Sequence, residues 1–375
     1  MKTYELVVPC HFGLEAVLKR EIYDLGYEIS RVEDGRVSFQ GDAEAVCRAN
    51  IFLRTAERVL IEVGRFRATT FEELFQGIKA LPWEDYIPVN GKFWVKKASS
   101  IKSKLFSPSD IQSIAKKAMV ERMKQYYDVE WFAEDGAPYP VRIFLLKDEV
   151  MVTLDTSGDS LHKRGYRTLT SKAPLTETLA ASLLLLTPWR PDRILVDPFC
   201  GSGTIAIEAA LIAKNRAPGL DRSFDAQRWA FLPAKVWMDA ADEAMDKEFH
   251  GKYEIWGGDI DPDAVELSRH NAELAEVDDI VKFEVDDATR FHWGGLYGRI
   301  VTNPPYGERL LEREEAGELY KAFGKAMDKL PDTWRVYVLS SHPDFERCYG
   351  RFADKKRKLY NGMLKCDLFM YGKRL

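Results

Sequence analysis

The chain has 375 residues and a mass of 43.0 kDa, and 46% of its residues are hydrophobic while 30% are charged. This length suits two or three domains, and this composition excludes a wholly disordered or fibrous chain. The net charge of -5 argues against a uniformly basic nucleic-acid binder, and the longest apolar helical stretch, 179–188, is about half of the roughly 20 residues that a bilayer span needs.

The five cysteines are scattered along the chain and form no C-x-x-C pair. We therefore expect no zinc site and no disulfide framework. The first 13 residues contain neither a long apolar run nor a small-residue cleavage site, so no secretory signal is visible. Together these features predict a cytoplasmic protein without a membrane or metal partner.

The first 155 residues predict a small α+β region that displays a basic helix. The first 65 residues follow a β-α-β-β-α pattern, with a hairpin turn at Asp34-Gly35. The predicted strands are 4–8, 28–32, 36–40, 59–66, 93–97, 141–146 and 149–155. The predicted helices are 14–25, 42–53, 70–80 and a basic helix that begins at 108.

Beyond residue 159, strands alternate with helices, which is typical of a doubly wound α/β fold with a parallel sheet. The predicted strands are 194–196, 253–257, 280–285, 299–302 and 334–340, followed by a hairpin of 356–359 and 364–371. The predicted helices are 175–186, one that ends near 214, 263–276 and 314–329. The irregular stretch 215–236, with Trp229 and Phe231, is interpreted as packing rather than as an active-site lid.

A local excess of positive charge is hidden in the acidic average. Residues 91–127 contain nine Lys and Arg against two acidic residues, so this segment carries +7 and the remainder -12. Cations interleaved with aromatic rings suit phosphates and unstacked bases, although a solvated helix face with core aromatics explains the same pattern. The predicted RNA contacts are Lys92, Lys96, Lys97, Lys102, Lys104, Lys116 and Lys117, with Lys163, Arg164 and Arg167 in a second basic run.

The segment Asp197-Pro-Phe-Cys-Gly-Ser-Gly-Thr204 lies directly between a predicted strand and a predicted helix. Glycines at such a turn let the backbone approach a ligand. A P-loop is excluded because the required Lys is missing, and a dinucleotide fingerprint is weakened by Ala206 in place of the third Gly. The carboxylate of Asp197 would repel a pyrophosphate but attract the ammonium group of an amino acid, which indicates S-adenosylmethionine.

Acidic residues also follow the next two strands. Asp259 is placed to accept both ribose hydroxyls, Ile260 to contact the adenine face, and Asp287 to accept the adenine amine. Each acid has an alternative role as a helix cap, and for Asp261, before Pro262, the cap is the better interpretation. The ordered set of acids at strand ends is more specific than any one of them.

The last motif is Asn303-Pro304-Pro305-Tyr306, which follows a predicted strand. Consecutive prolines hold the backbone extended and leave carbonyl groups as pure acceptors. The Asn303 side-chain oxygen and the Pro304 carbonyl can both accept hydrogen bonds from an exocyclic NH₂, and Tyr306 offers a stacking face for a base. These four residues, Asn303, Pro304, Pro305 and Tyr306, are the predicted catalytic residues.

In this order, DPFCGSGT, GGDID, VDDA and NPPY resemble the motifs of class I adenosylmethionine-dependent amino-methyltransferases over roughly 161–375. A narrower resemblance is to the THUMP-containing RNA methyltransferases. It rests on the basic N-terminal half and on two segments, LHKRGYR (161–167) and APLTETLA (173–180). Within these methyltransferases the chain is most similar to the bacterial large-subunit rRNA guanine-N2 methyltransferases of the K/L type, a group also named as adenine-specific DNA methylases.

The resemblance implies a role for each motif residue. Pro174, Leu175, Glu177 and Thr178 would border the methionine end of the cofactor, and Asp197, Gly201, Gly203 and Thr204 would form the main turn. Asp259 and Asp287 would hold ribose and adenine, and Asn303 to Tyr306 the target base. Phe199, Ile260, Ala288 and Asn303 complete the predicted cofactor contacts. Two-activity members carry a second methyltransferase module, so only the amino-methylating activity is expected of this chain.

The sequence therefore predicts a ferredoxin-like segment (1–65), a THUMP RNA-binding domain (45–155) and a class I methyltransferase domain (161–375). The expected function is methylation of guanine N2 in large-subunit (23S) rRNA or its precursor, with S-adenosylmethionine as cofactor. An adenine-N6 DNA methyltransferase and a non-catalytic RNA-binding assembly factor are the alternatives, and an NAD-dependent oxidoreductase is a more distant one.

Overall fold

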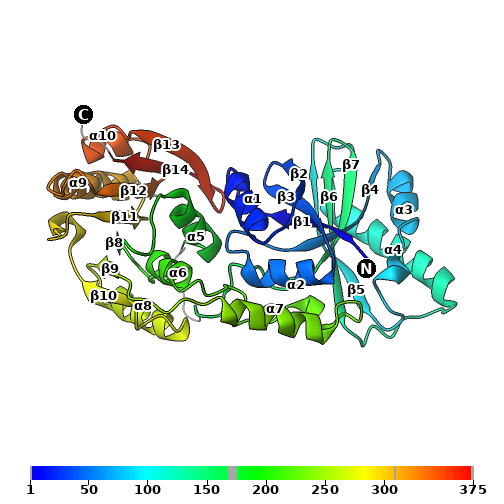
Figure 1. The fold of residues 1–375 in the computed structure, drawn as a ribbon. Coiled ribbons are helices and arrows are strands. Elements are labelled where there is room, and N and C mark those ends of the chain that lie inside the picture. Colours follow the sequence, from blue (N-terminus) through cyan, green and yellow to red (C-terminus); the bar gives the residue numbers. More distant parts are fainter. Residues whose placement is uncertain (1, 168–174, 308–309, 373–375) are drawn as a thin grey trace. The chain divides into compact units, whose positions relative to one another are not determined.

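The computed structural model describes residues 2–167, 175–307 and 310–372, and of residues 310 and 311 it describes the backbone alone. The chain divides into two compact units. Unit 1 contains Met1–Pro9, Glu21–Leu161 and Ser223–Glu243, and unit 2 contains Cys10–Arg20, His162–Arg222 and Ala244–Leu375. Strands β1–β7 and β8–β14 form two separate sheets (Figure 1). No helix within the described ranges combines the length and the apolar character of a membrane span.

Unit 1 is built on one seven-stranded sheet, to which the predicted ferredoxin-like and THUMP segments both contribute. Its strand order is β2-β3-β1-β4-β7-β6-β5, antiparallel except for the parallel pair β5 and β6. The strands are β1 (Tyr4–Pro9), β2 (Ile29–Glu33), β3 (Arg36–Gly41), β4 (Leu60–Arg67), β5 (Lys92–Ile101), β6 (Pro138–Leu146) and β7 (Glu149–Asp155).

The helices of unit 1 begin at side chains that satisfy the free backbone N–H groups of the first turn. Asp42 caps α2, Thr70 forms a capping box with Glu73 in α3, and Ser107 caps α4 ahead of Pro108. The helical elements are α2 (Ala43–Phe52), α3 (Phe71–Lys79), η1 (Trp83–Asp85), α4 (Pro108–Tyr127) and η2 (Asp225–Arg228); α1 (Glu15–Asp24) and α7 (Ala234–Asp246) have residues in both units.

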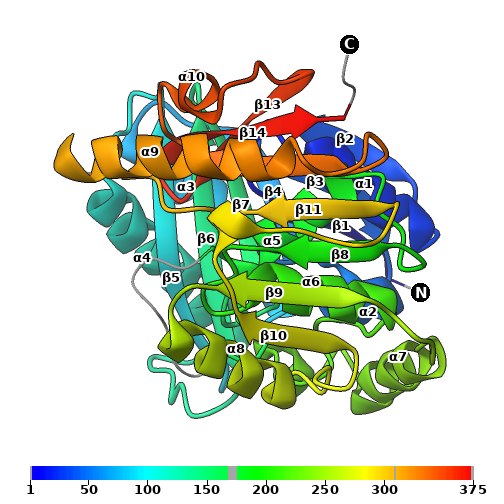
Figure 2. The same cartoon turned by 90° about the vertical axis from the view of Figure 1, so that its left-hand side faces the viewer.

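Unit 2 has the predicted doubly wound fold. Its seven strands run in the order β10-β9-β8-β11-β12-β14-β13, parallel from β10 to β12 and antiparallel at β14 and β13. Figure 2 shows β11, β8, β9 and β10 side by side. The strands are β8 (Ile194–Asp197), β9 (Ile255–Asp259), β10 (Val281–Val285), β11 (Gly298–Thr302), β12 (Arg335–Ser340), β13 (Lys355–Asn361) and β14 (Leu364–Tyr371).

Helices pack on both faces of this sheet. Because successive strand residues point to opposite faces, neighbours such as Ile300 and Val301 belong to different hydrophobic cores. Helices α5, α6 and α8 contribute to one core, and α9, α10 and η3 to the other. These elements are α5 (Glu177–Leu186), α6 (Thr204–Ala213), α8 (Pro262–Leu274), η3 (Ala288–Arg290), α9 (Leu310–Met327) and α10 (Phe345–Tyr349). This arrangement is Rossmann-like, as predicted.

The structure also differs from the predicted elements. Strand β5 extends to Ile101 rather than 97, and α7 and α10 were not predicted. The packing interpretation of 215–236 is confirmed for two aromatic residues within unit 1. Trp229 is buried, stacks on Tyr139 with ring centroids 5.0 Å apart, and donates from Nε1 to the Pro138 carbonyl at 2.7 Å. Phe231 packs edge-on against Tyr86 at 5.7 Å.

Candidate functional site

A cleft of about 710 Å³ lies at the carboxyl ends of the parallel strands of unit 2. Strand β8 has β9 on one side and β11 on the other, so chain connections diverge there, where α/β sheets commonly bind ligands. The volume falls within the roughly 300–1,000 Å³ of small-molecule and cofactor sites. Most predicted site residues line it: Leu175, Asp197, Phe199, Gly201, Thr204, Asp259, Ile260, Asp287, Ala288, Asn303, Pro304, Pro305 and Tyr306.

The glycine-rich turn connects β8 to α6. Gly201 and Gly203 both adopt positive φ, +52° and +81°, which glycine tolerates best. A Cβ at Gly203 would lie only 2.9 Å from the ring of Phe283 and 3.0 Å from Ser268. Glycine there therefore lets the turn pack closely on β10 and α8. Helix α6 begins at the cleft residue Thr204, so the partial positive charge of its N-terminus is at the cleft.

Asp197 ends β8 as a buried carboxyl group. Its Oδ1 accepts hydrogen bonds from the Thr302 hydroxyl at 2.6 Å and from the Phe199 N–H at 3.2 Å. Burial raises the pKa of Asp197 to about 7; these hydrogen bonds oppose the rise, and the nearby carboxylate of Asp259 adds to it. A cationic partner in the cleft therefore stabilises the ionised form of this carboxyl group.

The two other predicted acids are held by backbone groups. Asp259 accepts from the N–H of Gly201 at 2.9 Å with one oxygen and from the N–H of Asp261 at 3.0 Å with the other. Asp261 caps α8, as expected. Asp287 accepts from the N–H and hydroxyl of Thr289, and these hydrogen bonds lower the pKa of its carboxyl. Each carboxylate oxygen has more than one lone pair, so both acids retain capacity for a ligand.

The Asn303–Tyr306 segment follows β11. The Tyr306 hydroxyl donates to the side-chain oxygen of Asn303, and burial raises the pKa of the Tyr306 phenol. Tyr320 of α9 donates to the Pro305 carbonyl at 2.5 Å, and its hydroxyl lies 3.2 Å from the Ser340 hydroxyl at the end of β12. A side chain of α9, itself within hydrogen-bond distance of β12, thus holds the Pro305 carbonyl of this segment.

Sequence reasoning missed one wall of the cleft. Leu319 of α9 and the turn between β13 and β14 also line it, with Asn361, Gly362 and Leu364. Strand β14 pairs antiparallel with β12, with Ser340 opposite Asp367, so the start of β14 lies at the carboxyl end of β12. The predicted hairpin was the available signal, but its place beside the cleft depends on the pairing of β14 with β12, which joins segments distant in the sequence. The remaining lining residues are Thr176, Pro198, Cys200, Ser202 and Ile205.

Three of the predicted cofactor residues that the structure describes do not line the cleft, and a fourth, Pro174, falls outside the described residues. Gly203 packs on Phe283 as described above. Glu177 and Thr178 are buried in the first turn of α5. Thr178 lies 3.3 Å from His11 Nε2, and Glu177 pairs with Arg167 at 3.1 Å.

The structure argues against the predicted RNA contacts at Arg164 and Arg167. The Arg164 side chain is 3% exposed and pairs with Glu208 at 3.4 Å, because the buried carboxylate of α6 needs a positive partner. The Arg167 side chain is 8% exposed. It donates to the Leu175 carbonyl at 3.0 Å and the Thr204 hydroxyl at 3.2 Å, so it holds two residues that line the cleft.

The basic helix α4 is less available than predicted. Lys116 donates to Glu134 at 2.5 Å and to the Phe93 carbonyl, Arg122 pairs with Glu84, and Lys124 lies 3.5 Å from Glu130. Lys117 is the α4 cation for which the described residues provide no carboxylate. The other exposed cations lie on edge strand β5, in the segment after it and in the second basic run: Lys92, Lys96, Lys97, Lys102, Lys104 and Lys163. The described residues contain no metal-binding group of three or more His, Cys, Asp or Glu side chains.

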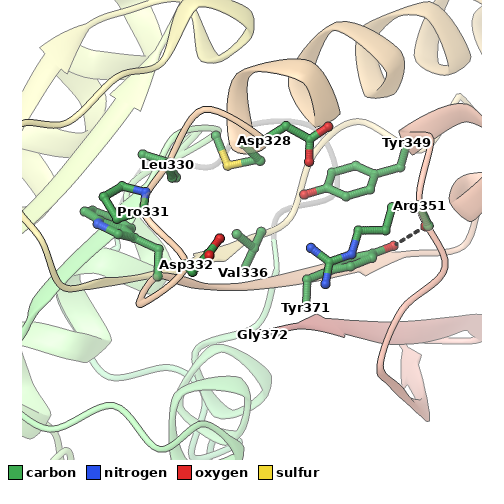
Figure 3. A pocket seen from close by; sticks show the side chains of 11 residues that line it. Asp328, Leu330, Pro331, Asp332, Val336, Tyr349, Arg351, Tyr371 and Gly372 are labelled. Atoms are coloured by element: carbon green, nitrogen blue, oxygen red, sulfur yellow. Dashed lines mark hydrogen bonds between the residues drawn. The ribbon is translucent and has the colours of Figure 1, made fainter. Parts of the chain in front are cut away.

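A second pocket lies near the start of β12 (Figure 3). Its volume is about 40 Å³, enough for only a few water molecules. Its lining includes Asp328, Asp332 and Arg351, and the Tyr371 hydroxyl donates to the Arg351 carbonyl at 3.4 Å. None of the predicted site residues lines it, so the larger cleft remains the candidate site.

Known families match the chain in three segments. Residues 164–369 match the family described as "RMKL-like, methyltransferase domain", residues 5–60 the "RlmL ferredoxin-like domain" and residues 68–155 the "THUMP domain". The three matches follow the order of the predicted domains.

Similar proteins cover the whole chain. "Putative RNA methyltransferase YpsC" of Bacillus subtilis (strain 168) is 48% identical over 378 residues, covering 100% of this chain and 97% of that protein. A "predicted N6-adenine-specific DNA methylase" from Listeria monocytogenes str. 4b F2365 is 47% identical with a TM-score of 0.94, covering 100% and 97%. "SMU.472, a putative methyltransferase complexed with SAH" is 43% identical with a TM-score of 0.94, covering 100% of both chains.

Proposed function

Because the chain belongs to the RMKL-like methyltransferase family, we propose that it transfers a methyl group from S-adenosylmethionine to the N2 amine of a guanine in 23S rRNA or its precursor. The methyltransferase class follows from the family. The proposal goes beyond the family in naming guanine as the target base, N2 as the methylated position and large-subunit rRNA as the substrate. The observation that carries it is one cleft that joins Asn303–Tyr306 to the acids Asp197, Asp259 and Asp287.

The residues of the cleft fit S-adenosylmethionine, as expected for a relative of a protein complexed with SAH. Asp197, buried and with a raised pKa, gains a cationic partner from the cofactor ammonium group. Asp259 receives the ribose hydroxyls, Asp287 the adenine amine, and Phe199, Ile260 and Ala288 contact the adenine. The cofactor supplies an electrophilic methyl group.

The Asn303–Tyr306 segment activates the acceptor. The Asn303 side-chain oxygen and the Pro304 carbonyl accept the two hydrogens of the target amine, so the nitrogen lone pair is less conjugated with the base and faces the methyl group. The amine loses its proton after attack, so no general base of matched pKa is required. Tyr306 stacks on the base, and its hydroxyl leaves the Asn303 oxygen when the amine binds.

RNA rather than DNA is favoured by the N-terminal half. A THUMP domain match and the name of the curated relative both support an RNA substrate, whereas the Asn-Pro-Pro-Tyr motif alone suits any sp² amine. The exposed cations of β5 and the following segment would bind phosphates, and the target base would be extruded from its stack. All five cysteines are free thiols, which supports the cytoplasm as the place of action.

The test is methyl transfer from labelled S-adenosylmethionine to total RNA and to genomic DNA from a strain that lacks the gene, followed by nucleoside mass spectrometry. We expect label in N2-methylguanosine of large-subunit rRNA. Label in DNA as N6-methyladenine would support the alternative suggested by the Listeria relative's name. No label in either polymer would contradict both candidates.

A further inference from the structure

The hairpin β13–β14 combines a strong positive charge with a position at the cleft. Residues 355–366 contain five Lys and Arg and no acidic residue, although the whole chain is acidic. Strand β13 is the edge strand of its sheet, so one side of this charged strand has no neighbouring strand. The turn of the same hairpin lines the cleft that contains Asn303–Tyr306.

The tip of the hairpin presents an apolar side chain to solvent. Met363 is 100% exposed, and the neighbouring cleft residue Leu364 is 38% exposed. Gly362 allows the tight turn, with φ of +60°. Tyr306 also interacts with the side chain of Asn361. An unburied methionine thus lies two residues from a side chain that contacts the proposed stacking tyrosine.

Cations and rings share one face of the hairpin behind the tip. Tyr360 pairs in register with Lys365, and Lys358, two residues before Tyr360, is on the same face with its Nζ 5.8 Å from the Tyr360 ring. Tyr360 also contacts Phe12 of unit 2 edge-on at 5.9 Å. Asp367 is opposite Lys358 in register, yet no ion pair joins them within the described residues.

The other cations of the hairpin are partly engaged by the protein. Lys356 pairs with Glu346 at 2.7 Å, and Arg357 donates to the Gly13 carbonyl at 2.6 Å. For Lys355, Lys358 and Lys365, the described residues provide no carboxylate partner. Lys355 pairs in register with Met370, at the end of the hairpin away from the turn, so Lys358 and Lys365 are the hairpin cations best placed to bind phosphates next to the cleft.

We propose that the β13–β14 hairpin holds the RNA strand that flanks the target nucleotide. Met363 enters the base stack beside the extruded nucleotide, and Lys358 and Lys365 bind the flanking phosphates. An extruded base leaves a gap, and apolar side chains such as methionine are used by other proteins as wedges between base steps. The inference rests on the proposed function, since it assigns RNA to the same cleft.

The test compares tip and cation variants in the full-length protein, with total RNA from a strain lacking the gene as acceptor. Met363→Ala should lower kcat about tenfold, equivalent to about 1.4 kcal/mol, with KM for RNA within about threefold, and Met363→Leu should restore kcat. The double variant Lys358→Gln/Lys365→Gln should weaken RNA binding. It should also reduce the salt slope, the slope of log affinity against log salt concentration, by about 1.4, as expected for two lost contacts to single-stranded phosphates.

Matched controls separate this role from general effects. Met238→Ala, at a methionine that is 63% exposed, should leave kcat unchanged, and Lys321→Gln/Lys325→Gln on α9 should leave the salt slope unchanged. Calorimetry should give wild-type affinity for S-adenosylmethionine in every variant. Wild-type kcat for Met363→Ala, or an unchanged salt slope for the double variant, would overturn the inference while RNA methylation stands. Absence of RNA methylation by the wild type would instead overturn the proposed function.

Discussion

The hydroxyl of Tyr306 donates a hydrogen bond to the side-chain oxygen of Asn303, the oxygen that the proposed reaction assigns to the target amine. The tyrosine therefore both competes for this acceptor and offers a ring to the base. Tyr306→Phe removes the competitor but keeps the ring, so kcat/KM should stay within about threefold of wild type. Tyr306→Ala should lower it by about 10–100-fold, because base stacking is worth about 1–3 kcal/mol. Steady-state kinetics with RNA tests this, and equal losses in both variants would show that the hydroxyl itself is required.

Asn303→Ala removes the acceptor that orients the target amine. We expect turnover to fall by at least about 10²–10³-fold, the usual cost of losing one preorganised hydrogen bond to a reacting group. The affinity for S-adenosylmethionine should remain close to wild type in calorimetry, because the three cleft acids remain in place. An active Asn303→Ala enzyme would refute the assignment.

Arg167 supports the cleft rather than binding RNA. Arg167→Met leaves the buried Glu177 without its partner, so the free energy of unfolding should fall by about 3–5 kcal/mol. The affinity for S-adenosylmethionine should also fall, since Leu175 and Thr204 lose their common anchor. Urea denaturation and calorimetry measure the two effects. A variant that keeps both values but loses RNA affinity would restore the original prediction of an RNA contact.

The raised pKa of Asp197 predicts a pH-dependent affinity for the cofactor. An ammonium group beside the carboxyl favours its ionised form, so binding should release a proton below pH about 7. The affinity should therefore rise with pH up to about 7 and then level off. Without that cationic partner the raised pKa makes ionisation costly, so unfolding free energy should fall as pH rises from about 4 to about 7. Calorimetry in buffers of different ionisation enthalpy measures the number of protons released on cofactor binding. Asp197→Asn should abolish this proton release.

The exposed cations near β5 should carry more RNA affinity than the paired cations of α4. The triple variant Lys97→Gln/Lys102→Gln/Lys117→Gln should reduce the salt slope of RNA binding by about 2, as expected for three lost contacts to single-stranded phosphates. Lys116→Gln is the matched control, because Lys116 is already bound to Glu134. Filter binding over a range of salt concentrations measures both. A larger effect of Lys116→Gln would show that the ion pair opens on RNA.

Local sequence was sufficient for most of the candidate site. Asp197 and Asp259 are the last residues of β8 and β9, Asn303 directly follows β11, and Asp287 lies two residues beyond the end of β10. Because parallel strands end at one edge of a sheet, the common cleft of these residues could be predicted from strand order alone. The glycines of the turn and the caps Asp42, Thr70 and Asp261 depend on neighbours within a few residues, so they too could be predicted.

Only the tertiary structure decided which charges are free and which hairpin meets the cleft. Arg164 looked like part of a basic run, yet its partner Glu208 lies 44 residues further along the chain. The turn of Asn361–Leu364 reaches the cleft because β14 pairs with β12, a pairing that no local pattern specifies. Caps, turns and strand ends depend on adjacent residues, so the sequence alone determined them. Burial and strand pairing depend on contacts between distant segments, so only the tertiary structure decided them.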